Sequence, residues 1–514
     1  MKKQFHIFIS ISLCLTCFAY AEDVPEVQNT KKRVNAPVFK KLYKGVNVDT
    51  ANPENGVWFK VQHDPGHFKA AADAGFESVR VFMPYHSSIA SNEAQIQDAL
   101  KHNLAIIVCM WGPYSWSSMN ASEDAKQIAD RWRELAKLWK KYPSDLIFEV
   151  LNEPAGIGFK KEKGHKKAME LYNAAVQAIR DVDPDRPILM GCPGWNDSIL
   201  LDPYVTEEYL SYSFEGGKGF YEDPNIGVSI HFYTPKHKDG VNFAMWTQSL
   251  KGHDWKPSIL KQITHAARWR ERIGVNIPVI TTEWGCWLFP DRSEEELKEW
   301  LDYHLSCFKK YDIGNMWYTG IIHNQGKFAI YNSELGWNKT VLKKLTGVIP
   351  TKLPKTSQII NGEFFSPDFA WHLSTDEIKK EFIADEPLSG AGMLKITVPQ
   401  ETEGQLYQET FKDTNKYKTA PGRTLIHLIK GQTYKISFMA KSKDGNGQMK
   451  VKLKNAKNQN LIYDSQSIKI GSEPKTYTKT YTHKGENEMD VQLAFDVGAK
   501  KQVLYLDKVE LVRN

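Results

Sequence analysis

The sequence has 514 residues, of which 41% are hydrophobic and 25% are charged, and this composition excludes a disordered or a collagen-like chain. Its formal net charge is +6, but lysine and arginine are interspersed with acidic residues, which argues against a nucleic-acid-binding protein. The length predicts two or three domains, or one barrel with an accessory module.

Residues 1–21 are predicted to be a secretory signal peptide. Lys2 and Lys3 precede an apolar run over residues 7–18, and Ala19-Tyr20-Ala21 offers a cleavage site of small residues. The apolar run is too short to span about 30 Å of hydrocarbon, and no later segment is apolar enough. We therefore expect a secreted or periplasmic protein without a membrane anchor after cleavage.

The cysteines that follow the predicted signal peptide are scattered along the chain, at Cys109, Cys192, Cys286 and Cys307. None of them forms a C-x-x-C pair that would indicate zinc. We expect them to be small buried apolar residues, although export permits one disulfide bridge.

Between residues 40 and 345, short apolar runs alternate with helical patterns. The runs occupy residues 44–48, 78–83, 105–111, 146–152, 188–191, 227–233, 279–284 and 314–318. Most are continuously apolar, as strands covered on both faces are, and helical patterns cover residues 67–74, 122–141, 166–182 and 293–310. Eight such units predict a (β/α)₈ TIM barrel within residues 22–346. A doubly wound sheet is the alternative, but the first run lacks the glycine-rich phosphate turn of such a sheet.

The pattern changes after residues 347–357, which are predicted to be a linker. Apolar and polar residues then alternate over residues 394–398, 434–440, 449–453, 477–483, 491–497 and 503–512. Turn sequences separate these runs, and no convincing helical pattern remains. Residues 358–514 are therefore predicted to form an all-β sandwich.

Two glutamates stand where predicted barrel strands end. Glu153, in Asn152-Glu153-Pro154, closes the fourth run, and Glu283 closes the seventh. Active residues of this barrel lie at the carboxyl ends of the strands, so the two carboxyl groups can face each other across its mouth. Retaining cleavage of a glycosidic bond needs such a pair about 5–5.5 Å apart, whereas inverting cleavage needs about 6.5–9.5 Å. Both spacings are compatible with the sequence.

Over residues 40–345 the sequence resembles glycoside hydrolase family 5, which contains cellulases and mannanases. The resemblance rests on motifs in one order: Ala-Gly-Phe-Glu-Ser-Val-Arg ending at Arg80, Asn152-Glu153-Pro154, His231-Phe232-Tyr233, Glu283-Trp284-Gly285, and Trp317. The sequence departs from the family at the end of the third run, where Trp111 replaces the usual histidine.

The resemblance implies a role for each carboxyl group. Glu153 would be the acid/base, with a pKa raised mainly by the charge of Glu283 and by partial burial. Glu283 would be the nucleophile, and Arg80 would hydrogen-bond it and lower its pKa. Arg80 also has a second interpretation, as part of a structural ion pair.

The other matching residues are implied to bind substrate. Asn152 would bind the sugar 2-hydroxyl, Tyr233 would hold Glu283, and His231 would line the site near Glu153. Trp317 would form the floor beneath the sugar, although it has a second interpretation as barrel core. Trp111 does not match the family, but with Tyr114 and Trp116 in the following loop it has the residue type of a sugar platform. All three also have a second interpretation as core residues.

Residues 358–514 resemble carbohydrate-binding modules of the galactose-binding-like jelly-roll type. The resemblance rests on two motifs, Asn361-Gly362-Glu363-Phe364 near Trp371 and Leu506-Asp507-Lys508-Val509. Such modules often hold a structural calcium ion, and Glu363 and Asp507 are its candidate ligands. The catalytic pair itself requires no cofactor or metal.

Together these observations predict a secreted, monomeric, retaining glycoside hydrolase that acts on a β-linked polysaccharide. An endo-β-1,4-glucanase is the first expectation. A β-mannanase, a xylanase or an exo-β-glycosidase of the same clan is the alternative. A non-catalytic carbohydrate-binding protein would not need the ionisable pair, and an esterase would need a Gly-x-Ser-x-Gly motif that the sequence lacks.

Overall fold

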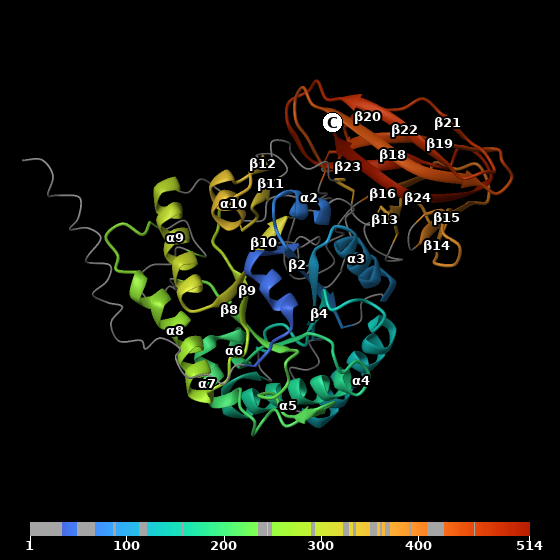
Figure 1. Cartoon of the computed structure of the whole chain (residues 1–514). Helices are drawn as coiled ribbons and strands as arrows, with labels where there is room; N and C mark the ends of the chain where they lie inside the picture. Colours follow the sequence, from blue (N-terminus) through green and yellow to red (C-terminus); the bar gives the residue numbers. More distant parts are fainter. Residues whose placement is uncertain are drawn as a thin grey trace, which may run out of the picture.

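The structure is a computed structural model of the chain. It describes residues 33–48, 67–85, 89–112, 121–155, 159–234, 244, 249–288, 293–321, 328–332, 336–349, 357–359, 362–364, 371–389, 392–408, 426–456 and 458–514. The predicted signal peptide, most of the predicted linker, Tyr114 and Trp116 lie outside these residues. The described chain forms a barrel surrounded by helices, blue to yellow in Figure 1, and an orange to red β-sandwich.

A ring of parallel strands forms the barrel. In order they are β1 (Gly45–Val48), β2 (Ser78–Pro84), β3 (Ala105–Trp111), β4 (Leu146–Glu149), β5 (Ile188–Met190), β8 (Ile226–Phe232), β9 (Val279–Trp284) and β10 (Ile313–Ile321). Strand β1 also pairs with β10, with Val46 opposite Trp317, and this pairing closes the ring. The predicted (β/α)₈ barrel is confirmed. The fourth strand, however, ends at Glu149 and not at the predicted Asn152.

The barrel is filled by side chains from alternate strand positions. Ile107, Ile147, Leu189 and Ile280 belong to one buried cluster. A 3₁₀ helix, η1 (Pro37–Lys44), adds Val38, Phe39 and Leu42 to the same cluster. The interior is therefore a packed core, as in other barrels of this class, and η1 contributes to it although the sequence did not predict that helix.

Helices cover the outside of the ring (Figure 1). They are α2 (His67–Asp73), α3 (Ile89–Lys101), α4 (Ala121–Trp139), α5 (Lys161–Arg180), α8 (Lys256–Ile273), α9 (Glu294–Lys310) and α10 (Lys339–Thr346), with the shorter α6 (Pro193–Asn196), η5 (Ser198–Leu200) and α7 (Leu201–Tyr204). Helix α9 begins at a Ser293 cap that accepts a hydrogen bond from Glu296 N. Within the described ranges, we find no helix long and apolar enough to cross a membrane.

Two pairs of short strands lie in the loops of the barrel. They are β6 (Ser213–Phe214) with β7 (Gly217–Lys218), and β11 (Tyr331–Asn332) with β12 (Gly336–Trp337). Cys109, Cys192, Cys286 and Cys307 are all buried and unbridged, as predicted.

The C-terminal part consists of two antiparallel sheets. One contains β13 (Trp371–Leu373), β16 (Gln405–Gln408), β23 (Glu488–Asp496), β19 (Gly447–Asn455) and β20 (Leu461–Asp464), joined by β17 (Ile426–Leu428) and β21 (Ile468–Ile470). The other contains β14 (Lys379–Ile383), β15 (Met393–Val398), β24 (Gln502–Arg513), β18 (Thr433–Ser442) and β22 (Lys475–Thr482). Their inner faces share one apolar core, which confirms the predicted all-β domain.

Candidate active site

Four barrel strands and the segment after one of them bring polar side chains together at one end of the barrel. Arg80 comes from β2, Glu149 from β4, His231 from β8 and Glu283 from β9. Glu153 lies four positions beyond the end of β4, with a positive φ of 35°. The connecting backbone still follows β3, because Asn152 N donates a 2.7 Å hydrogen bond to Met110 O. This bond keeps Glu153 at the carboxyl end of the barrel, where it was predicted.

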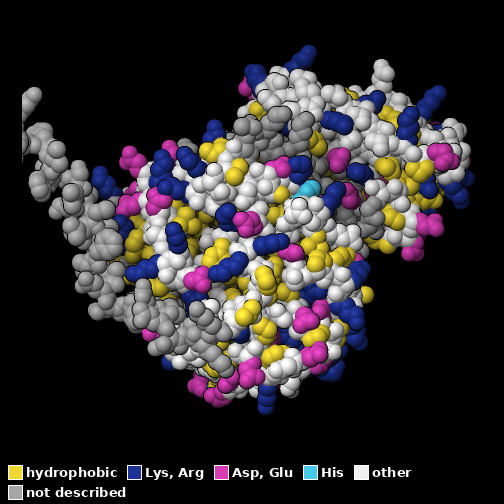
Figure 2. All heavy atoms as spheres, in the orientation of Figure 1, with side chains coloured by type: hydrophobic (Ala, Val, Ile, Leu, Met, Phe, Trp, Pro, Cys, Tyr) yellow, Lys and Arg dark blue, Asp and Glu magenta, His cyan; other side chains and the backbone are white. Residues whose placement is uncertain are grey.

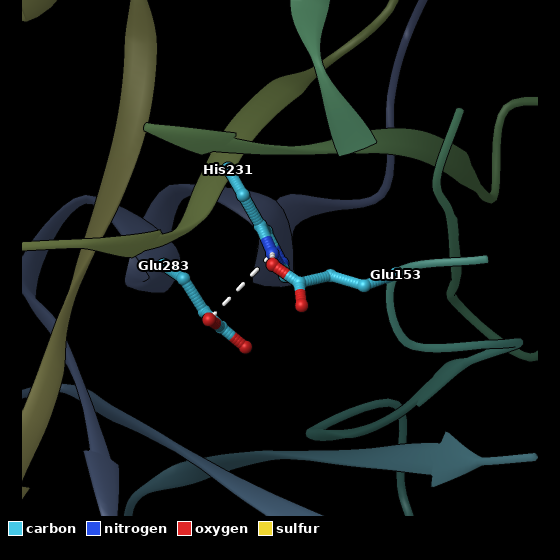
Figure 3. A group of neighbouring side chains, drawn as sticks. All are labelled: Glu153, His231 and Glu283. Carbon is cyan, nitrogen blue, oxygen red and sulfur yellow. Dashed lines mark hydrogen bonds and ion pairs between the residues drawn. The ribbon is translucent and has the colours of Figure 1, made fainter. Parts of the chain in front are cut away.

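The two predicted catalytic glutamates lie on either side of His231 (Figure 3). The Nδ1 atom of His231 is 2.5 Å from Oε1 of Glu153 and 3.6 Å from Oε2 of Glu283. One carboxyl oxygen of each glutamate and a ring nitrogen of His231 lie within 4.8 Å of one another. The two carboxyl groups are therefore near enough to act on the same bond.

Both oxygens of Glu283 accept hydrogen bonds. Arg80 Nη1 donates to Oε1 at 2.7 Å, and the Tyr233 hydroxyl donates to Oε2 at 2.8 Å. Both contacts agree with the roles implied for Arg80 and Tyr233. Because each donor stabilises the ionised form, the pair favours a charged Glu283.

Arg80 is fully buried and makes a second ion pair, which was the other interpretation of this residue. Its Nε donates to Glu149 Oε2 at 2.5 Å, and its Nη2 donates to Glu149 Oε1 at 3.1 Å. The guanidinium also donates to Oδ1 of Asn47 at 2.9 Å and to Oδ1 of Asn152 at 2.8 Å. Arg80 thus joins two carboxylates and fixes both asparagines.

The side-chain amide nitrogen of Asn152 has no partner among the residues that the structure describes. Its Oδ1 is occupied by Arg80, whereas its side-chain nitrogen donates no hydrogen bond to any residue that the structure describes. That donor is the group a sugar hydroxyl would need. Binding of the 2-hydroxyl by Asn152 stays a prediction.

Burial dominates the ionisation of the site. It raises the pKa of Glu153 to about 8, and Arg80 opposes this shift while Glu149 adds to it. The predicted direction is confirmed, and burial rather than a neighbouring charge is its main cause. Burial also raises the pKa of Glu283, against the opposing effects of His231 and Arg80. Arg80 therefore lowers the pKa of Glu283 as expected, but burial outweighs its effect.

His231 is neutral in this setting, because burial lowers its pKa to about 4. It lines the site beside Glu153, as predicted. Its other ring nitrogen, Nε2, lies 3.1 Å from the hydroxyl of Thr282. The histidine therefore connects the acid/base candidate to the strand that carries Glu283.

The prediction that Trp317 forms the sugar floor is wrong. Its side chain is 0% exposed, donates from Nε1 to Phe328 O at 2.9 Å, and packs against Trp284 and Trp300. The barrel-core interpretation therefore applies. Successive residues of a strand face opposite ways, so the next residue, Tyr318, takes the inner position. Its ring lies 6.2 Å from that of Tyr233, beside the catalytic pair.

Trp111 ends β3 and is partly exposed. Its ring contacts Phe82 edge-on at 5.4 Å, and Phe82 in turn lies 4.8 Å from the Arg80 guanidinium. Trp111 is thus near the polar centre of the site. Its contact with sugar stays a prediction.

The residues behind the two glutamates were not predicted from the sequence. Glu149 is fully buried and accepts from Arg80, while Ser229 and Thr282 surround its Oε1. A charged residue inside the apolar run Leu-Ile-Phe-Glu was the signal for Glu149, since buried charges require a partner. The structure also explains why residue 285 is a glycine, because a Cβ at this position would lie 2.6 Å from Tyr318 O.

Glu153, His231 and Glu283 also have the ligand types and spacing of a metal site. Two observations favour the metal-free interpretation. Arg80 already supplies the positive charge beside Glu283, and Glu153 and His231 are hydrogen-bonded to each other. The arrangement resembles an acid beside a nucleophile more than an open cation site.

The family model described as Cellulase (glycosyl hydrolase family 5) matches residues 39–323, which is more than half of the chain. A second model, described as Carbohydrate binding domain, matches residues 357–502. The chain is a glycoside hydrolase, as its barrel and paired glutamates indicate. It belongs to glycosyl hydrolase family 5 and carries a C-terminal carbohydrate-binding domain.

Curated relatives carry endoglucanase names. Endoglucanase C of Acetivibrio thermocellus is 24% identical over 54% of this chain and 88% of its own length. Endoglucanase Z of Dickeya dadantii is 23% identical over 30% of this chain, and an endoglucanase of Clostridium saccharobutylicum is 28% identical over 29%. The chain spans about a third of the length of these last two proteins.

The chain is also similar to solved structures, of which two are given. Thermotoga maritima Cel5A in complex with cellobiose is 22% identical, with a TM-score of 0.47 over 60% of this chain and 98% of that one. XEG5A, a xyloglucan-specific endo-β-1,4-glucanase from a metagenomic library, is 21% identical, with a TM-score of 0.48 over 60% and 98%.

Proposed function

We propose that this protein is a secreted, retaining endo-β-1,4-glucanase. The observation that carries the proposal is the pair of carboxyl groups on either side of His231, with oxygens within 4.8 Å. Retaining enzymes hold their carboxyl groups about 5–5.5 Å apart, whereas inverting enzymes leave about 6.5–9.5 Å for a water molecule. The observed separation supports the retaining mechanism.

The two glutamates have environments that suit different roles. Glu153 is protonated at neutral pH, since burial raises its pKa to about 8, and it can protonate the leaving glycosidic oxygen. Glu283 is held by Arg80 and Tyr233 and attacks the anomeric carbon to form a glycosyl-enzyme. Glu153, now ionised, then removes a proton from the water that releases the sugar.

The substrate assignment rests on the curated relatives, which are named endoglucanases. A β-1,4-glucan is accordingly the proposed substrate, and β-mannan is the second candidate. The C-terminal domain supports a polymeric substrate, because its family is described as carbohydrate-binding. The predicted signal peptide supports export.

The test is the release of reducing sugar from glucan, mannan, xylan and xyloglucan. We expect the native chain to release sugar from β-1,4-glucan and Glu283→Gln to release almost none. Glu295→Gln, at an exposed position on α9, is the matched control and should keep full activity. A fall in viscosity that precedes sugar release would establish endo cleavage, and proton NMR of the first product anomer would establish retention. A folded native chain that is inactive on every polymer would contradict the proposal.

We also propose where the C-terminal domain binds glycan. A groove of about 700 Å³ crosses the outer face of β16, β23 and β19, and its lining includes Gln405, Gln448, Lys450 and Asp496. Tyr407 shares the outer face of β16 with Gln405 and can add a ring contact. In the Glu283→Gln background, Tyr407→Ala should weaken retention on insoluble glucan. Tyr505→Ala, a tyrosine on the other sheet, should not. Equal retention of both variants would exclude the groove.

A structural calcium ion is a further proposal for this domain. Asp507 is fully buried, accepts hydrogen bonds from Ser389 N and Lys508 N at 2.6 Å, and lies near Glu363. Burial raises the pKa of Asp507 to about 7, and the charge of Glu363 acts in the same direction. Two neighbouring acidic groups, a fully buried Asp507 and a half-buried Glu363, fit the donor set of a hard cation. Calcium would supply the positive charge that neutralises them.

A further inference from the structure

Glu149 occupies the centre of the polar network behind the catalytic pair. It is fully buried, and two hydrogen bonds of 2.5 and 3.1 Å from Arg80 reach its two oxygens. Burial acts to raise the pKa of Glu149, but the charge and hydrogen bonds of Arg80 outweigh it, so that the pKa is lowered. Glu149 is therefore ionised at neutral pH, and an ionised carboxylate can only accept hydrogen bonds.

Two hydroxyl groups extend from Glu149 towards the next strands. The Ser229 hydroxyl donates to Glu149 Oε1 at 2.9 Å. The Thr282 Oγ1 atom lies 2.5 Å from Ser229 Oγ and 3.3 Å from Glu149 Oε1. A hydroxyl has one proton. Since the proton of Ser229 points to Glu149, the 2.5 Å contact between the two hydroxyl oxygens needs the proton of Thr282, which is then not available to His231. The lone pairs of Thr282 Oγ1 are then left for a donor.

That donor is His231. Its Nε2 lies 3.1 Å from Thr282 Oγ1, which can only accept there, so Nε2 carries the proton. The amide of Asn196 is also near Nε2, but at 3.4 Å it is the weaker contact. A neutral imidazole has one protonated nitrogen, so Nδ1 presents a lone pair.

This lone pair faces Glu153, whose Oε1 is 2.5 Å from Nδ1. The proton between the two atoms must belong to the carboxyl group, because Nδ1 has none. The hydrogen-bond chain therefore favours a protonated Glu153, the form that can donate to a leaving group.

We propose that Glu149 is a positioning residue for the acid/base. It orients the hydroxyls of Ser229 and Thr282, and they fix the His231 tautomer that leaves the proton on Glu153. This inference rests on the proposed function, in which Glu153 is the general acid. It assigns a role to a third glutamate that makes no contact with the reacting bond.

Titratable groups face Glu149 from every element around it. Arg80 lies on β2, Cys109 on β3, Tyr172 on α5 and His231 on β8, while Glu153 and Glu283 complete the site. Removing the charge of Glu149 alone would therefore shift several groups. Thr282→Val breaks the same chain without changing any charge, and it is the sharper variant.

The first readout is the tautomer of His231 in the full chain labelled with ¹⁵N-histidine. Its signals are assigned by their loss in His231→Gln. We expect a proton on Nε2 in the native protein, and a shift towards Nδ1 in both Thr282→Val and Glu149→Gln. A proton on Nδ1 in the native protein, or an unchanged tautomer in Thr282→Val, would overturn the proposal. This measurement does not depend on activity, so it decides the proposal even if the chain cleaves no glucan.

The second readout is kinetic. In both variants kcat/KM on β-1,4-glucan should fall about 10- to 100-fold, within the range that general acids contribute, and its basic limb should move to lower pH. The loss should be smaller on dinitrophenyl cellobioside, whose leaving group needs little protonation. Asp223→Asn removes a buried partner of Arg180 elsewhere in the barrel and should leave the basic limb in place. If kcat/KM fell equally on both substrates and the basic limb of the pH profile did not move, Glu149 would have only a structural role. That result would overturn the proposal.

Discussion

The hydroxyl of Tyr233 donates a 2.8 Å hydrogen bond to Oε2 of Glu283, the oxygen that Arg80 leaves unoccupied. Burial raises the pKa of Tyr233 well above its ordinary value, so the hydroxyl remains a donor at every working pH. Tyr233 and Arg80 therefore share the stabilisation of one carboxylate. A substitution of Tyr233 or Arg80 should therefore change both the reactivity and the pKa of the Glu283 carboxyl group.

Tyr233→Phe should lower kcat/KM on β-1,4-glucan by about 10- to 100-fold, because a hydrogen bond to a charged group contributes about 1.5–3 kcal/mol. Losing a donor disfavours the ionised form of Glu283, so the acid limb of the pH profile should move to higher pH. Tyr43→Phe is the matched control, since Tyr43 donates to Asp312 at 2.7 Å outside the site. An unmoved acid limb in Tyr233→Phe would contradict the assignment.

The activity should have a basic limb near the pKa of Glu153, which burial raises to about 8. The acid must be protonated, so kcat/KM should be maintained below this pH and fall as pH rises through it. Glu153→Gln should lose about 10²- to 10⁴-fold on glucan and much less on dinitrophenyl cellobioside. The pH profile of Glu153→Gln should also lack the basic limb. A basic limb present in both the native chain and Glu153→Gln would assign that titration to another group.

The same shift predicts a stability effect. A carboxyl group whose pKa is higher in the folded than in the unfolded chain binds more protons when folded. Its stabilisation is complete below the unfolded pKa, near 4.5, and is lost as pH rises through the folded pKa of about 8. The Tm of the native chain should therefore fall relative to that of Glu153→Gln between about pH 5 and about pH 9. A constant difference in Tm would contradict the raised pKa.

Trp317 and Tyr318 should respond differently to substitution, because they face opposite sides of β10. Trp317→Phe removes a buried indole and its hydrogen bond to Phe328 O, and should cost about 1–3 kcal/mol of unfolding free energy with little change in KM. Tyr318→Ala should instead raise KM, because its ring lies beside Tyr233. Chemical denaturation and kinetics on both variants make the comparison. A raised KM in Trp317→Phe alone would restore Trp317 as the sugar floor.

The calcium proposal predicts a stability effect confined to the C-terminal domain. Adding EGTA should lower the unfolding temperature of that domain, and Ca²⁺ should restore it, because an ion that binds only the folded state stabilises it. Asp507→Asn should unfold at the lower temperature with or without Ca²⁺. Asp464→Asn, at an exposed position on β20, should respond like the native chain. A native chain insensitive to EGTA, with no bound calcium by mass spectrometry, would contradict the proposal.

The barrel was predictable because its strands are continuous apolar runs, and these follow from burial on both faces. The positions of Glu153 and Glu283 were predictable because each motif follows or closes an apolar run, although β4 itself ends four residues before Glu153. Glu149 was missed although its charge inside an apolar run was a signal, since its partner Arg80 is distant in sequence. Tyr318 was missed for another reason. Side chains alternate along a strand, so an error of one residue exchanges the inner face for the outer one.

The closure of the barrel by β1 and β10 has a consequence for synthesis and for proteolysis. Strand β1 is made early, but one of its two neighbours is completed only when the ribosome has passed residue 321. Until then both β1 and β9 have an edge with unpaired backbone groups, and such edges pair readily with other chains. A fragment that ends before residue 313 contains both Glu153 and Glu283 but keeps these edges open. Such fragments should aggregate, and the enzyme can start work only when its last barrel strand is in place.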